Sequence, residues 1–67
     1  MTQYLCKWCK ASVYPVFDHY EIHQFDYFND DNGYTEANRT MLLTLKKGQR
    51  LDLSDGISFY HEIEVLT

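Results

Sequence analysis

The sequence predicts a small β-rich fold, all-β or α+β, built on an antiparallel meander with an N-terminal hairpin that carries a C-x-x-C pair. Two observations predict it. Apolar and polar residues alternate with a period of two in the last third of the chain, and glycines interrupt this alternation at two places. A length of 67 residues fits a single domain, residues 1–67, whose small core commonly gains stability from a metal, an oligomer or a partner.

The meander is expected over residues 40–66. Three-residue loops at residues 46–48 and 54–56 close two consecutive hairpins in this interpretation. Gly48 and Gly56 then occupy the third loop position, which requires a left-handed backbone conformation that penalises a side chain.

These loop lengths also align one apolar face. Residues directly opposite each other in an antiparallel pair project on the same side of the sheet. The expected register therefore pairs Leu43 with Leu51, and Leu51 with Phe59. Truncating Leu51 in such a core would cost about 2–5 kcal/mol.

A helix over residues 35–46 competes with the first strand of the meander. Thr35 is a suitable N-cap residue, and Gly48 is a suitable stop. One face of this helix would carry Ala37, Met41, Leu42 and Leu45. The strand is preferred because the helix would leave Leu51 and Leu53 without the partner strand that the hairpin supplies.

The middle of the chain, Val16–Phe28, is rich in aromatic residues. This enrichment favours a strand with a bulge near Gln24 over a helix. The sequence Asn29–Gly33 that follows has the composition of a strong turn.

The only two cysteines and a pair of histidines are the residues best suited to defined chemistry. Cys6 and Cys9 are separated by two residues, and His19 and His23 are four apart. Together with Tyr4, this pattern resembles part of a Cys2His2 zinc finger, although nine residues separate Cys9 from His19 where the family has about twelve. The resemblance implies that the two cysteines and the two histidines are zinc ligands.

The secondary structure around the histidines decides between a zinc site and its alternatives. On a helix, His19 and His23 would stand about 6 Å apart and share one ion. On a strand they would be ~13 Å apart and could not both reach it. The expectation is therefore either no cofactor or one zinc ion. Without zinc, Cys6 and Cys9 are free thiols or a redox pair in a reducing compartment.

Charge is distributed unevenly along the chain. The net charge is −4, and residues 11–38 hold six acids and no Lys or Arg. An ordinary nucleic-acid binder needs a basic stripe, so we expect no direct DNA binding. No secretory signal or membrane-spanning run is visible, and a cytoplasmic protein is expected, in the host cytoplasm if the chain is viral.

Aromatic residues are interleaved with these acids, and this combination is typical of interface anchors and electrostatic steering. It predicts a non-enzymatic protein that binds another protein and inhibits or regulates it. The profile resembles, as a class, phage-encoded inhibitors of host defence or nucleic-acid enzymes, some of which mimic DNA phosphates with carboxylates. The expected partner contacts are Tyr20, Asp26, Tyr27, Asp30, Asp31 and Tyr34. The opposing interpretation is that the rings form a core while the acids face water.

Two other functions remain open at this stage. One is a zinc-knuckle adaptor that presents Lys7, Trp8 and Lys10 on the metal loop to a protein or a nucleic acid. The other is a structural subunit that joins a larger assembly by adding a strand at a sheet edge. A homo-oligomer also stays open.

Overall fold

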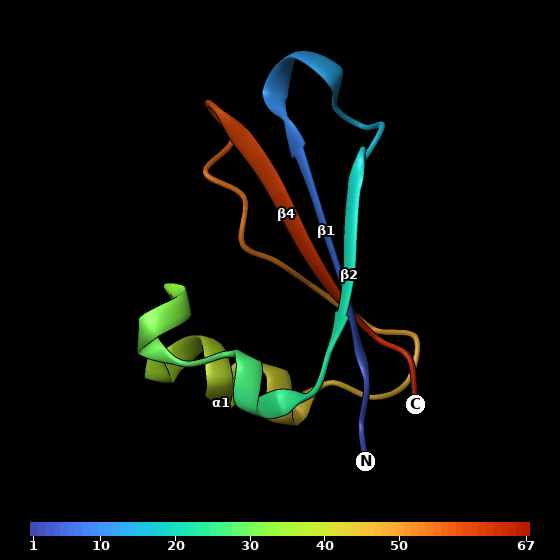
Figure 1. The fold of residues 1–67 in the computed structure, drawn as a ribbon, viewed down its shortest axis with the longest axis vertical. Coiled ribbons are helices and arrows are strands. Elements are labelled where there is room, and N and C mark those ends of the chain that lie inside the picture. Colours follow the sequence, from blue (N-terminus) through green and yellow to red (C-terminus); the bar gives the residue numbers. More distant parts are fainter.

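Four antiparallel strands form one sheet, accompanied by one α-helix and three short 3₁₀ turns. The computed structural model describes all residues, Met1–Thr67. The strands are β1 (Tyr4–Lys10), β2 (His19–His23), β3 (Arg50–Asp52) and β4 (Phe59–Val65), and the helix is α1 (Glu36–Thr44). The 3₁₀ turns are Ala11–Val13, Phe25–Tyr27 and Asp30–Asn32. The sheet order is β2-β1-β4-β3 (Figure 1), so the predicted β-rich α+β class is confirmed.

The two seven-residue strands, β1 and β4, lie at the centre of the sheet and pair over their whole length. The predicted alternation in β4 is confirmed from His61 onward: His61, Ile63 and Val65 are buried, while the residues between them are partly exposed. Phe59, expected on the same buried face, is 42% exposed. The N-terminal hairpin is also present, because β1 turns back into β2 and carries both cysteines.

The predicted strand over residues 40–45 is wrong, because this segment belongs to α1. Thr35 caps the helix: its side chain accepts a hydrogen bond from the Asn38 N–H at 3.1 Å, and the Asn38 side chain accepts one from the Thr35 N–H at 3.0 Å. This reciprocal capping satisfies two N–H groups that a helix start otherwise leaves unpaired. Leu42 is fully buried and Leu43 is 69% exposed, the reverse of the strand expectation.

The hairpin predicted at residues 46–48 is therefore absent, and the one at residues 54–56 is longer than expected. β3 and β4 do pair as neighbours, but the register sets Leu51 opposite Ile63, and residues 53–58 form the connection. The Asp55 carboxylate accepts hydrogen bonds from three successive N–H groups, those of Ile57, Ser58 and Phe59, at 2.8–3.1 Å. These bonds hold the longer loop and lower the pKa of Asp55, with its bond to the Ser58 side chain the largest cause.

Gly48 and Gly56 have the positive φ angles that the sequence predicts, 86° and 74°. Gly48 nevertheless lies between α1 and β3 rather than in a hairpin. The turn at Asn29–Gly33 is confirmed as a 3₁₀ turn ended by Gly33 in a left-handed conformation. In the stretch Val16–Phe28, the chain leaves the sheet after His23 in place of the expected bulge.

One face of the sheet is covered only at the end where the chain begins and ends (Figure 1). There, Phe28, Tyr34 and Leu42 pack with the sheet residues Tyr4, Cys6, Leu51, Ile63 and Val65 as one buried cluster. The covering segment runs from the end of β2 through α1. Because 10 of 67 residues are buried in total, this cluster supplies most of the hydrophobic stabilisation.

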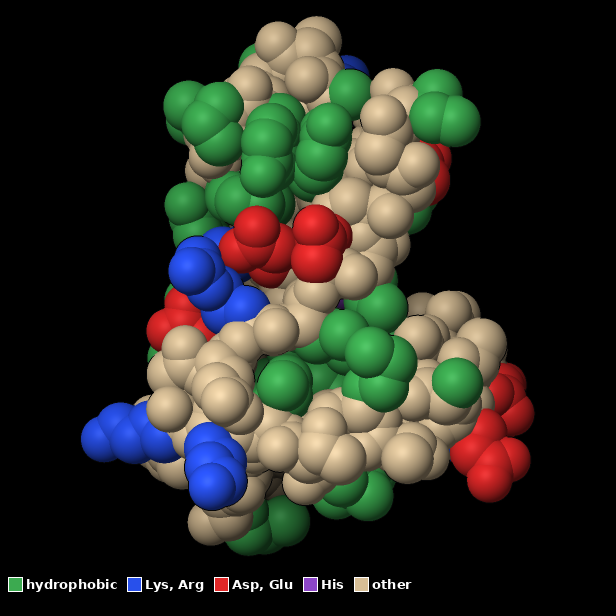
Figure 2. All heavy atoms as spheres, turned by 180° about the vertical axis from the view of Figure 1, so that it is seen from behind, with side chains coloured by type: hydrophobic (Ala, Val, Ile, Leu, Met, Phe, Trp, Pro, Cys, Tyr) green, Lys and Arg blue, Asp and Glu red, His purple; other side chains and the backbone are tan.

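At the other end, the loop between β1 and β2 folds over the opposite face of the sheet. The Tyr14 ring stacks on Tyr60 with centroids 3.7 Å apart, and the Phe17 ring lies 5.9 Å from the Lys7 ammonium. Figure 2 shows hydrophobic side chains gathered at this end, above a band of acidic and basic ones. Within the sheet, Lys7 pairs with Glu64 at 3.5 Å.

Two adjacent leucines of α1 provide a test of the fold. Leu42→Ala should lower the free energy of unfolding by about 2–5 kcal/mol, because it leaves a cavity in the core. Leu43→Ala, on the exposed side, should change it by no more than about 0.5 kcal/mol. Urea denaturation measures both. The strand alternative expects the opposite order, so a costly Leu43→Ala with a harmless Leu42→Ala would contradict α1.

Candidate functional site

Four exposed carboxylates lie on the covering segment between β2 and α1. We call residues 25–36 the acidic turn segment; its acids are Asp26, Asp30, Asp31 and Glu36. All four residues are exposed, and the Asp30 side chain is 84% exposed. Each lies in the first turn of a short helix or of α1, where the unpaired N–H groups of a helix start favour negative charge.

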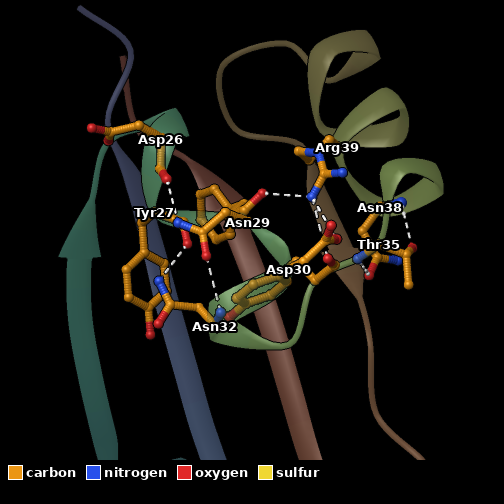
Figure 3. A network of polar contacts seen from close by, with 10 residues as sticks. Asp26, Tyr27, Asn29, Asp30, Asn32, Thr35, Asn38 and Arg39 are labelled. Carbon is orange, nitrogen blue, oxygen red and sulfur yellow. Dashed lines mark hydrogen bonds and ion pairs between the residues drawn. The ribbon is translucent and has the colours of Figure 1, made fainter.

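Two asparagines fix the backbone of the acidic turn segment (Figure 3). The Asn29 side chain accepts a hydrogen bond from the Asn32 N–H at 3.0 Å and donates one to the Asp26 carbonyl at 3.0 Å. The Asn32 side chain donates to the Tyr27 carbonyl at 2.8 Å. These bonds reinforce the turns, because the Asn32 N–H also donates to the Asn29 carbonyl at 3.1 Å and the Tyr27 carbonyl also accepts from the Asn29 N–H at 2.9 Å.

Arg39 of α1 ties the segment to the helix. Its guanidinium donates to the carbonyls of Phe28 at 3.3 Å and Tyr34 at 3.2 Å, and it pairs with Asp30 at 3.4 Å (Figure 3). It is the only Lys or Arg between residues 11 and 45, so the one cation at hand is used to hold the turn. The other three acids of the segment have no ion-pair partner.

The same segment is anchored in the core by two rings. Phe28 is fully buried, with its ring edge-on to Tyr4 at 5.3 Å and to Tyr34 at 4.9 Å. Edge-to-face pairs of this kind add about 0.5–1.5 kcal/mol each beyond burial. The acids are therefore held in place by the buried rings of Phe28 and Tyr34 on the side facing the sheet and by the hydrogen-bond network on the side facing solvent.

The six predicted partner contacts do not form one surface. Asp26, Asp30 and Asp31 are exposed within the acidic turn segment, as the prediction requires. Tyr34 is 6% exposed and belongs to the core. Tyr20 is 55% exposed, but its register position opposite Lys7 sets it on the other face of the sheet from the segment.

Tyr27 is half-buried and serves the packing of the segment. Its ring stacks on His23 with centroids 3.5 Å apart and meets Phe28 edge-on at 5.4 Å. A Tyr27→Ala change would therefore disturb the fold as well as any interface. The residues that hold the surface, Asn29, Asn32 and Arg39, were missed in the sequence, where only the turn composition pointed to the two asparagines.

The structure does not bring the four predicted zinc ligands together. Cys6 and Cys9 lie three residues apart on β1, so their side chains project from opposite faces of the sheet. No group of three or more His, Cys, Asp or Glu side chains is arranged to hold a metal ion. His19 and His23 share a face of β2, but the Glu21 carboxylate lies between them, 2.6 Å from each Nε2.

The same geometry bears on a redox pair. Three residues along a strand correspond to ~10 Å, beyond the ~7 Å limit between the Cα atoms of a disulfide. Both thiols are free and buried. Burial, followed by the charge of Glu21, raises the pKa of Cys6 to about 12, and burial with Asp18 and Glu62 raises that of Cys9. Protonated, buried thiols are poor nucleophiles.

His61 is the one buried polar residue, and both of its ring nitrogens are occupied. Nδ1 lies 2.9 Å from the Lys7 carbonyl and donates to it, which leaves Nε2 to accept from the Tyr34 hydroxyl at 2.9 Å. Trp8 stacks flat on the ring with centroids 4.6 Å apart. Trp8 is thus part of the packing rather than presented on a metal loop, and burial lowers the pKa of His61.

Comparison with protein-family models, with curated proteins and with solved structures found no match to this chain. None of its helices has the length and apolar character needed to cross a membrane.

Stability should depend on pH through His61. Because folding lowers its pKa, the unfolded chain takes up a proton that the folded chain resists. The free energy of unfolding that comes from keeping His61 neutral is present in full above the ordinary histidine pKa of about 6.5. It is lost as the pH falls from there through the lower pKa of the folded state. Urea midpoints measured between about pH 7 and 5 should show this loss. His61→Gln should make the urea midpoint depend less on pH. A midpoint that changes with pH as in the parent protein would contradict a buried neutral His61.

The thiols should report on the cysteine sites directly. In the folded protein a thiol reagent should modify Cys6 and Cys9 slowly, and in urea it should modify both at the rate of free cysteine. A chelator should change neither these rates nor the circular dichroism spectrum. Thiols that become reactive and a fold that melts on chelation would instead restore the zinc hypothesis.

Proposed function

We propose that this chain is a small, non-enzymatic regulator that binds a basic surface of another protein through the acidic turn segment. The observation that carries this proposal is a set of four exposed carboxylates on a backbone that side-chain hydrogen bonds and two buried rings hold in place.

A fixed backbone favours binding because association must otherwise order the loop. Immobilising flexible side chains and loops costs about 0.5–1.5 kcal/mol per group, which is subtracted from the affinity. In the acidic turn segment, the backbone is already held in the free chain by hydrogen bonds from the side chains of Asn29, Asn32 and Arg39. Residues that only kept the protein in solution would need no such framework.

The charge distribution supports a basic partner. Arg39 pairs with Asp30 and so offsets one of the four negative charges of the segment, which leaves three, and the other bases of this half of the chain follow α1 from Lys46 onward. A surface of one sign raises the rate of encounter with the opposite sign. Nucleic-acid-processing and defence proteins carry basic sites of this kind, and carboxylates that occupy such a site would inhibit it.

The polar groups best placed for chemistry favour binding over catalysis. Cys6 is a fully buried thiol with a raised pKa, and both nitrogens of His61 are engaged in hydrogen bonds. Neither group is free to act on a substrate in this arrangement.

The double substitution Asp30→Asn with Asp31→Asn tests the surface. With a partner captured from cell extract on the immobilised chain, stopped-flow kinetics should show slower association and little change in dissociation, because long-range charge acts mainly on the encounter. Added salt should lower the association rate of the parent protein until it approaches that of the variant. The fold should be retained, since Arg39 keeps its two carbonyl bonds.

The matched control is Asp18→Asn with Asp52→Asn, which changes the net charge equally at exposed positions outside the segment. It should leave association nearly as fast as in the parent. If both pairs slow association equally, only the net charge matters and the acidic turn segment is not the contact surface. A captured partner that ignores both pairs would refute the proposal.

A further inference from the structure

The two edges of the sheet differ in how they are protected. β3 is three residues long, and its exposed residues Arg50 and Asp52 are charged, with Arg50 paired to Glu62 at 3.8 Å. Short, charged edge strands resist pairing with other chains. β2 is five residues long and has no Lys, Pro or bulge, and its one carboxylate, Glu21, lies 2.6 Å from the ring nitrogens of His19 and His23. Figure 1 shows no element beside the outer side of β2.

The free hydrogen-bonding groups of β2 can be identified from the ladder of β1. Ala11 N–H donates to the Ser58 carbonyl at 3.1 Å, and Leu66 N–H donates to the Gln3 carbonyl at 2.8 Å, both in the register of β1 with β4. Odd-numbered residues of β1 therefore direct their peptide groups toward β4. Even-numbered ones direct theirs toward β2.

On β2, the partners of these even-numbered residues are His19, Glu21 and His23. Because peptide groups alternate in direction along a strand, Tyr20 and Ile22 direct their N–H and C=O groups away from the sheet. Their side chains are also exposed, 55% and 59%, on the sheet face opposite the acidic turn segment. The outer edge of β2 thus offers open hydrogen-bonding groups together with two large apolar side chains.

We infer that this edge pairs with β2 of a second copy of the chain, antiparallel and with the two-fold axis at Glu21. The sequence His19-Tyr20-Glu21-Ile22-His23 is nearly palindromic. In this register Tyr20 lies opposite Ile22 of the second copy, and the two-fold axis also sets Ile22 opposite Tyr20 of the second copy. These are the residues whose peptide groups are free, so the two pairs form four backbone hydrogen bonds and one eight-stranded sheet.

The side chains of the two copies complement each other on one face. On one face, the two Tyr20–Ile22 pairs combine aromatic and β-branched residues, the combination that stabilises cross-strand contacts. On the other face, His19 lies opposite His23, and the two Glu21 carboxylates meet at the axis. Each carboxylate lies 2.6 Å from the Nε2 atoms of His19 and His23, and the contact between the two carboxylates is the one unfavourable pair of this register.

The occupant is a second copy rather than an unrelated strand because the match is set by this chain's own sequence. A slip by one residue would set Tyr20 opposite Glu21, and a slip by two residues would keep the faces but pair only one of the two free residues of each strand within β2, so the register centred on Glu21 forms the most backbone hydrogen bonds. The surface is separate from the acidic turn segment, so a dimer would present two such segments and bind through both.

Sedimentation equilibrium of the purified chain, without any partner, tests the dimer. The chain should reach twice its monomer mass as its concentration is raised toward the millimolar range. Ile22→Lys should weaken dimerisation by roughly a hundredfold or more, because the two-fold axis places the change in the interface twice. Leu43→Lys, equally charged and on an exposed leucine of α1, should leave it unchanged.

Disulfide trapping tests the register. Glu21→Cys should give a covalent dimer on mild oxidation, because equivalent residues meet at the axis within the ~7 Å limit for a disulfide. Tyr20→Cys should not give a covalent dimer, because residue 20 lies opposite residue 22 of the second copy, two positions away from its own equivalent. Both variants also carry Cys6→Ala, because Cys6 lies directly opposite residue 21 on β1 and its thiol would compete for the new cysteine within the chain. Cys9 is buried and should stay unmodified.

A chain that remains monomeric at high concentration refutes the inference. A dimer that Ile22→Lys leaves intact, or one in which Tyr20→Cys is trapped and Glu21→Cys is not, refutes this edge or this register. Loss of dimerisation through Ile22→Lys, with Asp30→Asn and Asp31→Asn leaving it unchanged, shows that self-association is independent of the proposed partner surface.

Discussion

The packing of Phe28 against Tyr4 and Tyr34 is the interaction on which the rest of the structure depends. A sheet of four short strands has one face that must be covered, and a single segment between β2 and β3 does this. Phe28 is fully buried at the centre of that cover. The two 3₁₀ turns on either side of it, and α1 beyond them, take their positions from this ring, and so do the acids that they carry.

This constraint makes one polypeptide segment serve both the core and the surface. The side of the acidic turn segment that faces the sheet is aromatic, and the side that faces solvent is acidic. Backbone groups between the two sides are satisfied by Asn29, Asn32 and Arg39. A change that loosens the core would therefore also loosen the proposed partner surface, whereas exposed carboxylates can be changed without cost to the core.

Small size also explains what is left uncovered. The cover reaches only one end of one sheet face, and the loop between β1 and β2 covers the opposite face at the other end. Tyr20 and Ile22 lie outside both covers, on the edge strand. A domain with so small a core gains more from self-association than a larger one would, and β2 is the edge that is open to it.

The sequence by itself determined the period-two strand β4, the positive-φ glycines, the turn at Asn29–Gly33 and the acidic character of the middle segment. These features depend on local conformation or on composition, which neighbouring residues decide. Only the tertiary structure decided that residues 36–44 form a helix. The apolar pattern of Met41–Leu45 fits both the period of a strand and the period of a helix, and the burial of Leu42 selects the helix. The tertiary structure also decided which rings are buried, that Leu51 faces Ile63, and that Arg39 braces the acidic turn segment, since each of these contacts joins residues distant in the chain.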